Sequence, residues 1–588
     1  MKCSLRILLA TLLIVWRSTS EVSAQSEADG KLTAFFQSYL QEHFRQQPLD
    51  ATSLGDHHFD ALLDDLSPSA RAGWHELARR TLTELLQRVP YASLSRDGQI
   101  DFEIFRHNLE TQLWLDDNTH EFAEDPRIYC NTINDSVYQL LTQSTLPKET
   151  NIANCLTRMA EFPRIVAAAK ASLSRPPKAV LETAIRQNRG AIDFFQSDIF
   201  KLAGETPQLA ALQKACTNAV TVLEDYQHFL EGPLLAQATD NWRLGKSKFN
   251  RKLELILDAG TTADQVLADA RAEFVSVRSE MYVVARQLWS HYFPAQPVPP
   301  DDAGGRRETI TKVINAVNAE HGKPEELVAD AQAAVREIKA FISDRHYLRL
   351  PEPDLCQVLE MPEFRRGNSL AYLESAPPLD PAAASHYAIS PPPADWTPRQ
   401  IASFLEEYNH HMLKILTIHE GYPGHYVQLE YANRHPSLIR RVYQSGPFVE
   451  GWAVYGEITM LNEGFGKGDL RLRLMQQKFY LRAVANAILD NQFHCTAMTD
   501  AEAMKFLQED AFQSEGEARL KLIRAKQSST QLSTYFVGRM AHYRLHQQIA
   551  RELGDRFDLG RYHEAVLSHG SVPVKYLPEL VRRSLGSK

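Results

Sequence analysis

The sequence predicts a mainly α-helical protein that folds as two lobes and contains one small β-sheet. Apolar residues recur at spacings of three and four in segments such as 32–44, 72–89 and 209–230, which is the pattern of helices with one buried face. Strand-like alternation of apolar and polar residues is scarce. The 588 residues are 44% hydrophobic and 23% charged, so the chain can bury a large core and is long enough for more than one lobe.

The N-terminus has the features of a secretory leader. Lys2 and Arg6 precede the apolar residues 7–16, and the small-residue stretch 22–24 (VSA) follows. This order predicts a cleaved signal peptide of residues 1–24 and a periplasmic or secreted mature protein. The apolar run is too short to span a bilayer, and no other stretch approaches the required ~20 residues, so we expect no membrane contact after cleavage.

Charge and cysteine content narrow the class of protein. The net charge of −9 comes without a long single-sign run, which argues against a nucleic-acid partner that would need a basic face. The mature chain keeps five cysteines with no CxxC pair, so a cysteine-based zinc site is not expected. An exported protein can form disulfides, for which Cys130 and Cys155 are the nearest pair along the chain.

A segment rich in Pro, Gly and Asp, residues 294–307 (PAQPVPPDDAGGRR), is the best candidate for a linker. It divides the mature chain into an N-terminal helical lobe, residues 25–300, and a C-terminal catalytic lobe, residues 301–588. Within a second Pro-rich stretch we expect a small sheet beside the motif helix described next. Its expected strands are Cys356–Met361, Leu370–Glu374 and His386–Ser390.

The helix that leads to the chemical motif has clear start signals. Thr397 is predicted to cap it, Pro398 suits the first helical position, and Gln400 completes a capping box. Apolar residues then keep a spacing of three and four through residues 401–416. His419 continues this stripe, so we expect its side chain to point inward.

The stretch 417–430, TIHEGYPGHYVQLE, carries two histidines and a glutamate in this helical context. His419 and His425 are six residues apart, which places them about 240° apart around a straight helix, so a regular helix cannot bring both to one metal ion. The extra residues accompany Pro423 and Gly424, a pair at which a helix widens or breaks. We predict that a local bulge there brings His425 beside His419.

Glu420 and the segment 450–457, EGWAVYGE, complete the predicted site. Glu420 would act as the general base that takes a proton from an attacking water. A catalytic zinc site usually has three protein ligands, and Glu450 and Glu457 share one face of the next predicted helix. We assign Glu450 as the third ligand and Glu457 as the group that orients a histidine. Zn²⁺ is the expected ion, although manganese and cobalt accept the same donors.

The sequence also allows other roles for its histidines. A lone histidine on an apolar face is usually a hydrogen-bonded core residue. His542 and His546 have the four-residue metal spacing, but no glutamate follows His542 and arginines lie close by, so we predict a polar helix face. His410 and His411 lie too far from the first motif histidine to replace the second, and they either line a cleft or face solvent.

The two motifs resemble those of a known family. "HEGYPGH" and "EGWAVYGE" are similar to the HExxPGH and EGWAxYxE motifs of the bacterial domain-of-unknown-function 885 family, which is grouped with the HExxH-type zinc peptidases. The second motif also resembles the NEGFAxYxE of zinc aminopeptidases, whose first glutamate is the third zinc ligand, and this supports Glu450. The resemblance implies a metallopeptidase-like helical fold with a deep cleft between its lobes.

Further residues are carried over from this resemblance. "LDNQFHC" resembles the family's Asp-x-x-x-His segment, which implies that Asp490 and His494 face the cleft. "QLSTYFVGRM" resembles its QxxxYxxG element, so Tyr535, or else His494, is the candidate that stabilises the oxyanion formed when water attacks a carbonyl group. The chain departs from the family at Asn491 and Gln492, where a Thr-Gly pair is usual. "FDLGRYHEAVLSHGSVPVKYL" resembles the family's C-terminal signature and implies a structural role.

These features predict an exported zinc metallopeptidase that hydrolyses short peptides as an exopeptidase or oligopeptidase. One alternative is a zinc amidase or esterase that acts on a non-peptide substrate, since the metal ligands would be the same. The other is a catalytically inactive periplasmic binding protein. A binding protein has no need of a general base beside a ligand histidine, and Glu420 therefore favours an enzyme. The oligomeric state stays open.

Overall fold

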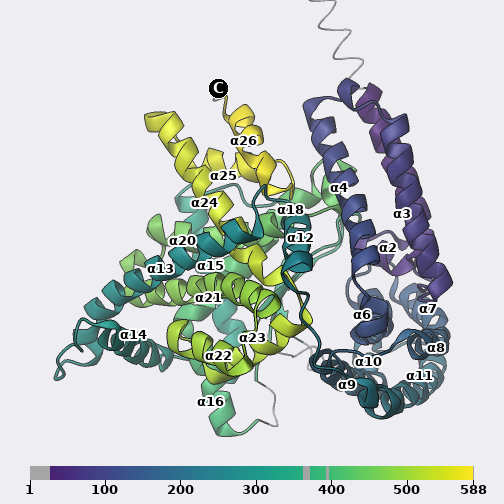
Figure 1. Cartoon of the computed structure of the whole chain (residues 1–588), viewed down its shortest axis with the longest axis horizontal. Coiled ribbons are helices and arrows are strands. Elements are labelled where there is room, and N and C mark those ends of the chain that lie inside the picture. The colour runs from purple at the N-terminus through teal and green to yellow at the C-terminus, as the bar shows by residue number, and fades with distance from the viewer. Residues whose placement is uncertain (1–26, 362–370, 393–395, 587–588) are drawn as a thin grey trace, which may run out of the picture.

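The computed structural model describes residues 27–361, 371–392 and 396–586, and the predicted signal peptide lies outside these ranges. The described chain is mainly helical with a small sheet, as predicted (Figure 1). None of its helices is long and apolar enough to cross a membrane. The five described cysteines are free, so Cys130 and Cys155 form no disulfide.

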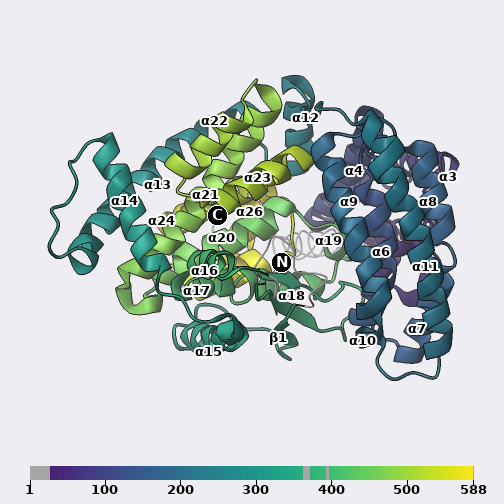
Figure 2. The same cartoon turned by 90° about the horizontal axis from the view of Figure 1, so that it is seen from below.

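The first part of the described chain lies on one side of the molecule (Figure 2). A helix over residues 27–46 is followed by the long pair α3 and α4, and the helices α6 to α11 pack as a separate bundle beside them. The bounds are α2 Pro48–Leu54, α3 Pro68–Arg88, α4 Arg96–Asn118, α5 Glu121–Glu124, α6 Arg127–Thr142, α7 Lys148–Met159, α8 Phe162–Ser172, α9 Lys178–Asp193, α10 Ile199–Ala203 and α11 Leu209–Phe229.

The second part holds the motif residues. Its long helices pack in pairs, α13 along α21 and α20 along α24. The bounds are α12 Lys246–Leu257, α13 Ala263–Tyr292, α14 Ala303–Asn318, α15 Leu327–Asp344, β1 Cys356–Glu360, β2 Ala371–Glu374, β3 Ser385–Ile389, α16 Pro398–Glu407, α17 His410–Glu420, α18 His425–Asn433, α19 Leu438–Val442, α20 Gly446–Asn462, α21 Leu470–Cys495, α22 Asp500–Lys505, α23 Glu515–Gln527, α24 Thr534–Leu553, α25 Leu559–Leu567 and α26 Leu577–Leu585.

The described chain has two hydrophobic cores. The smaller core belongs mostly to α6 to α11 and includes Tyr129 and Tyr226. The larger core joins residues of the first helices, such as Phe36 and Phe105, to the whole second part. The segment 294–307 does not separate these cores, because α13, which ends just before it, and α14, which begins within it at Ala303, both pack into the larger one. The division between cores therefore differs from the lobe boundary that the sequence predicts.

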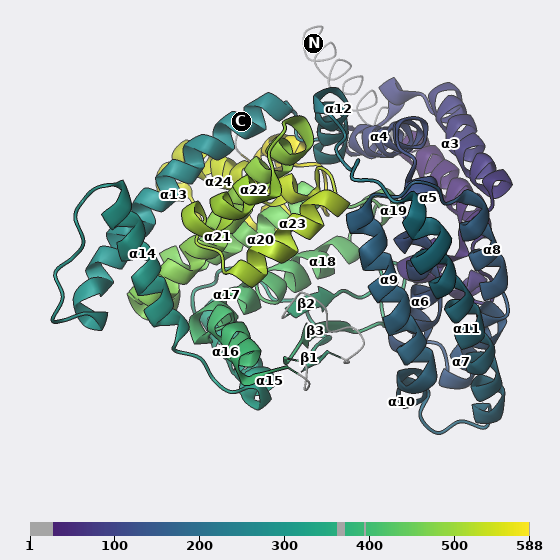
Figure 3. The same cartoon turned by 60° about the horizontal axis from the view of Figure 1, so that its bottom comes forward.

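The three expected strands form one sheet beside the motif helix (Figure 3). Strand β3 pairs in parallel with β1 and antiparallel with β2. Tyr387 of β3 shares a hydrogen bond of 3.1 Å with Thr417 of α17. The backbone N–H of Leu373 in β2 donates to the carboxylate of Glu420 at 3.1 Å. The prediction of a sheet here is confirmed, and its strand β2 touches a predicted catalytic residue.

The single helix expected from Thr397 to the motif is two helices. Thr397 and Gln400 form the predicted capping box at the start of α16. However, Asn409 ends that run and caps α17, because its side chain accepts hydrogen bonds from two backbone N–H groups of the next turn. Apolar spacing alone does not reveal such a break, since it depends on one polar side chain that competes for backbone donors. His419 is buried near the end of α17, as predicted.

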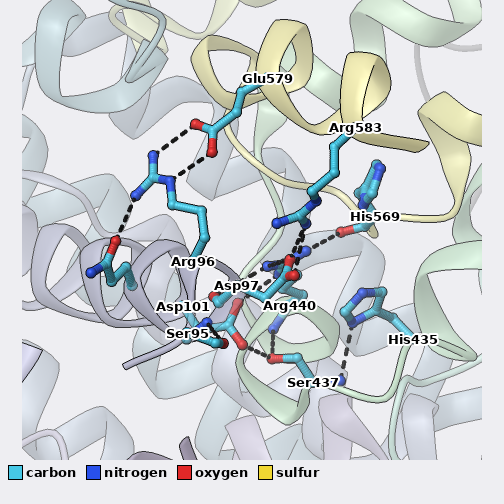
Figure 4. Close-up of polar contacts among 12 residues, drawn as sticks. Ser95, Arg96, Asp97, Asp101, His435, Ser437, Arg440, His569, Glu579 and Arg583 are labelled. Carbon is cyan, nitrogen blue, oxygen red and sulfur yellow. Dashed lines mark hydrogen bonds and ion pairs between the residues drawn. The ribbon is translucent and has the colours of Figure 1, made fainter. Parts of the chain in front are cut away.

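A cluster of ion pairs fastens the first helices to the last one (Figure 4). Arg440 of α19 is only 1% exposed, and its guanidinium donates to Asp101 at 2.6 Å and to Asp97 at 3.0 Å, both on α4. Arg583 of α26 also pairs with Asp97, at 2.7 Å. Because α19 follows α18 directly and precedes α20, this cluster connects both ends of the described chain to the helices that carry the motifs.

The buried arginine is expected to matter for stability. Arg440→Met should lower the free energy of unfolding by ~3–5 kcal/mol, because it leaves the mostly buried carboxylate of Asp101 without its cationic partner. Arg519→Met, at an exposed ion pair on α23, is the matched control and should change it by less than about 0.5 kcal/mol. Urea denaturation followed by circular dichroism measures both variants, and equal effects would contradict the role of the cluster.

A histidine joins the first helices to the segment after β2. The Nδ1 atom of His57 lies 2.8 Å from Asp60, and its Nε2 atom lies 3.1 Å from Asp380. The hydrogen bond to Asp60, supported by the one to Asp380, raises the pKa of His57 to about 9 against the opposing effect of burial.

This contact predicts a loss of stability at alkaline pH. Since the folded pKa of His57, about 9, exceeds its ordinary value of ~6.5, its contribution is complete below pH ~6.5 and disappears as the pH rises through about 9. The melting temperature of the wild type should therefore fall more between pH 6.5 and 9.5 than that of His57→Gln. Parallel pH profiles would show that this imidazole carries no charge in the folded protein.

Candidate metal centre

The six-residue spacing of the motif histidines is resolved by a complete break between two helices. Helix α17 ends at Glu420, residues 421–424 form a turn, and α18 begins at His425. A Cβ atom at Gly424 would lie 1.9 Å from the carbonyl oxygen of His419, so only glycine permits this approach. The predicted bulge is wrong in form, because the backbone turns back on itself and does not widen.

The turn places the two imidazole rings side by side. The ring centroids of His419 and His425 are 4.6 Å apart, with an angle of 85° between the ring planes. The indole N–H of Trp452 on α20 donates to the carbonyl oxygen of Pro423 at 2.8 Å, which holds the turn against the helix that carries the second motif.

Glu450 of α20 completes the group. Its Oε2 atom lies 3.4 Å from Nε2 of His425 and 3.8 Å from Nε2 of His419. Two ligands about 2.1 Å from a tetrahedral ion lie about 3.4 Å apart, so these separations suit one shared ion. One donor atom from each of these three residues lies within 4.8 Å of the other two. The structure thus brings together the three ligands expected from the sequence.

The surroundings of His419 and Glu450 fit a metal. Glu457, fully buried on α20, lies 2.8 Å from Nδ1 of His419. With Glu457 ionised, the proton would be on that nitrogen and the Nε2 lone pair of His419 would face Glu450. Burial, followed by the charge of His425, keeps the pKa of His419 well below its ordinary value, so this imidazole is neutral as a ligand must be. The Oε2 atom of Glu450 is buried and has no hydrogen-bond partner among the described residues.

Glu420 follows His419 directly in the chain and does not belong to the group of three residues that could hold a metal ion. Burial, with a further contribution from the charge of Glu450, raises the pKa of Glu420 to about 7. The backbone N–H of Leu373 fixes its carboxylate at 3.1 Å. A carboxyl group with this pKa can accept and return a proton near neutral pH.

A small cavity of about 130 Å³ is lined by His419 and Glu420. Three cationic side chains, Arg482 of α21 and Lys521 and Arg524 of α23, form part of its wall. Sequence reasoning missed them because they belong to no motif and their two helices meet only in the fold. Among the described residues, this cavity is the space found beside the candidate metal centre. The deep cleft that the resemblance implies stays a prediction.

Tyr535 of α24 lines the same cavity. Its hydroxyl oxygen accepts a hydrogen bond of 3.1 Å from Arg524, which leaves the hydroxyl proton available for the cavity. Two glycines set its position, because the backbones of α20 and α24 touch at Gly451 and Gly538, where a Cβ atom on either would clash. Glu450 directly precedes Gly451 on α20, and Tyr535 lies about one turn before Gly538 on α24.

Asp490 and His494 do not reach the metal ligands. Asp490 accepts hydrogen bonds from Thr530 at 3.0 Å and Ser533 at 2.8 Å, so it holds the segment that leads into α24. His494 packs between aromatic rings and lies 3.0 Å from the carbonyl oxygen of Ala525. Asn486 is the last residue of α21 that lines the cavity. Asp490 lies about one turn beyond it on the same helix face, and His494 lies about two turns, or ~12 Å, beyond it. Of the two candidates for the oxyanion donor, Tyr535 lines the cavity and His494 does not.

The other histidines have structural partners. His542 is fully buried with Nε2 3.2 Å from the carbonyl oxygen of Phe448, and His546 shares a hydrogen bond of 2.9 Å with Tyr455. The predicted polar face is therefore a packed contact between α20 and α24. His411 pairs with Glu320 at 3.0 Å.

The fold and the site define a mainly helical protein with a candidate metal centre of two histidines and one glutamate. Residues 48–581 match the family described as "Bacterial protein of unknown function (DUF885)", and the chain belongs to this family. No curated protein matches it.

Two solved structures are similar to the chain over nearly its whole length. One is titled a "putative lipoprotein of unknown function" from Shewanella oneidensis, with 28% identity and a TM-score of 0.78 over 93% of this chain and 99% of that one. The other is a "putative lipoprotein" from Colwellia psychrerythraea, with 18% identity and a TM-score of 0.78 over 95% of this chain and 100% of that one. At 18% identity, the similarity to the Colwellia psychrerythraea structure shows a shared fold and nothing further.

The close approach at Gly424 generates a direct prediction. Gly424→Ala should lower the melting temperature and weaken zinc binding at least tenfold, because the new Cβ atom would push His425 away from His419. Gly456→Ala is the matched control, since a Cβ atom there would make only an ordinary contact of 3.6 Å with Pro423. Zinc titration calorimetry measures both variants, and unchanged affinity in Gly424→Ala would contradict the account of the turn.

Proposed function

We propose that this protein is an exported zinc-dependent metallopeptidase that hydrolyses short peptides. The proposal rests on one observation above all. His419, His425 and Glu450 converge with their donor atoms facing one another, and Glu420 stands beside them with its pKa raised to about 7. This set matches the requirements of a hydrolytic zinc site, with three protein ligands and a general base next to them.

In this mechanism each residue of the site has a separate role. Zinc held by the two histidines and Glu450 would supply Lewis-acid polarisation of a carbonyl group and activation of water. Glu420 takes the proton of the attacking water and returns it to the leaving amine, for which a pKa near neutrality is suited. Tyr535 donates its hydroxyl proton in a hydrogen bond to the oxygen of the attacked carbonyl group. Glu457 keeps His419 in the tautomer and orientation of a ligand.

The N-terminus bears on export, and the residues of the cavity bear on the alternative functions. The leader-like residues 1–24 favour export, and so does the similar Shewanella oneidensis structure, whose title calls it a "putative lipoprotein". A zinc amidase or esterase would use the same residues. An inactive binding protein would need neither a buried base such as Glu420 nor a hydroxyl donor such as Tyr535 in the same cavity.

The role of Glu420 is tested by separating metal binding from catalysis. Glu420→Gln should keep about one zinc per chain and lose activity on a peptide library by a factor of about 10²–10⁴, since it removes the base and leaves the ligands intact. His410→Ala, an exposed histidine on the same helix, is the control and should match the wild type in both. Mass spectrometry of the digests follows cleavage. An active, zinc-loaded Glu420→Gln variant would rule out this mechanism.

A further inference from the structure

We propose that the cavity beside the candidate metal centre binds the carboxylate of the substrate's C-terminal residue, so that the enzyme cleaves next to a free C-terminus. This inference rests on the proposed function and adds the substrate class and the end that is attacked. It follows from the charge of the wall, from one buried lysine and from the size of the cavity.

The wall of the cavity is cationic. Arg482, Lys521 and Arg524 line it, whereas Glu420 is the one acidic residue among the described residues of the wall. The cations also lie close to the reaction site. The guanidinium of Arg482 lies 4.8 Å from the ring centroid of Phe479, whose ring is 5.6 Å from that of His419. A substrate group in this cavity would therefore meet positive charge in the same space that His419 and Glu420 line.

Lys521 is the group in the wall that most needs an anion. It is 6% exposed, and within the described ranges it forms no hydrogen bond and no ion pair. Glu517, one turn earlier on α23, pairs with Arg482 at 3.0 Å instead. Burial, followed by the charges of Arg482 and Arg524, keeps the pKa of Lys521 well below its ordinary value. Burying an amine without a partner is costly, and a bound carboxylate would supply that partner.

The size of the cavity favours the end of a chain over its middle. A volume of about 130 Å³ corresponds to about four water molecules at ~30 Å³ each. Sites for larger ligands usually have ~300–1,000 Å³. One small terminal residue with its carboxylate matches this volume, whereas a longer stretch of peptide would have to extend out of the cavity.

Binding to an inactive but intact protein tests this inference independently of turnover. Zinc-loaded Glu420→Gln protein is titrated by calorimetry with N-acetyl-trialanine, with its C-terminal amide, and with an amidated tripeptide that ends in aspartate. We expect the free acid to bind at least tenfold more tightly than either amide. Adding Lys521→Met should bring the ratio of acid to amide close to one, whereas adding Arg519→Met, on the exposed face of the same helix, should leave it unchanged.

The outcomes separate this inference from the proposed function. Equal binding of acid and amide, no binding of either, or a ratio that survives Lys521→Met would overturn it. Equal binding of the aspartyl amide and the free acid would overturn the assignment to the chain terminus. Selective binding of the acid by a protein whose wild type cleaves no peptide would support the carboxylate site and refute the peptidase. Lys521→Met should not lower the melting temperature, because it replaces a buried amine, which has no partner within the described ranges, with an apolar side chain.

Discussion

The candidate site depends on the backbone contact between Gly424 and the carbonyl oxygen of His419. A hypothetical Cβ atom at Gly424 would be 1.9 Å from that oxygen, so the turn exists only because the residue has no side chain. The contact lets α18 start against the last turn of α17 and brings His425 beside His419 despite a spacing that a straight helix cannot use. Without it the two histidines would face different directions.

A second close backbone contact, this time between glycines of α20 and α24, positions the other residues of the site. Gly451 and Gly538 bring the backbones of α20 and α24 together, which places Glu450 and Tyr535 near the turn from the other side. Trp452 bonds the turn to α20, and Glu457 on the same helix holds His419. Helix α20 therefore supplies a predicted ligand, the support of another ligand and the clamp on the turn.

Much of this could be predicted from the sequence, and the limits have physical causes. Helical periodicity and the capping box at Thr397 are local signals, and so are the motif residues, which is why the helical class, the small sheet and the convergence of the three ligands were foreseen. The break at Asn409 depends on one capping side chain that periodicity does not register. His494 was misplaced because a motif gives spacing along a helix but not where the cavity ends. Arg482 on α21 and Lys521 on α23 line the same cavity, but neither helix carries a sequence motif that would have predicted this.

The most direct test of this account is the metal content of purified protein, measured by elemental analysis on the wild type, on His425→Ala and on the control His410→Ala. The account predicts about one zinc per chain in the wild type and in the control, and a near-complete loss in His425→Ala. Zinc retained by His425→Ala would show that the turn at Gly424 does not serve a metal, and the hydrolytic mechanism would have to be abandoned.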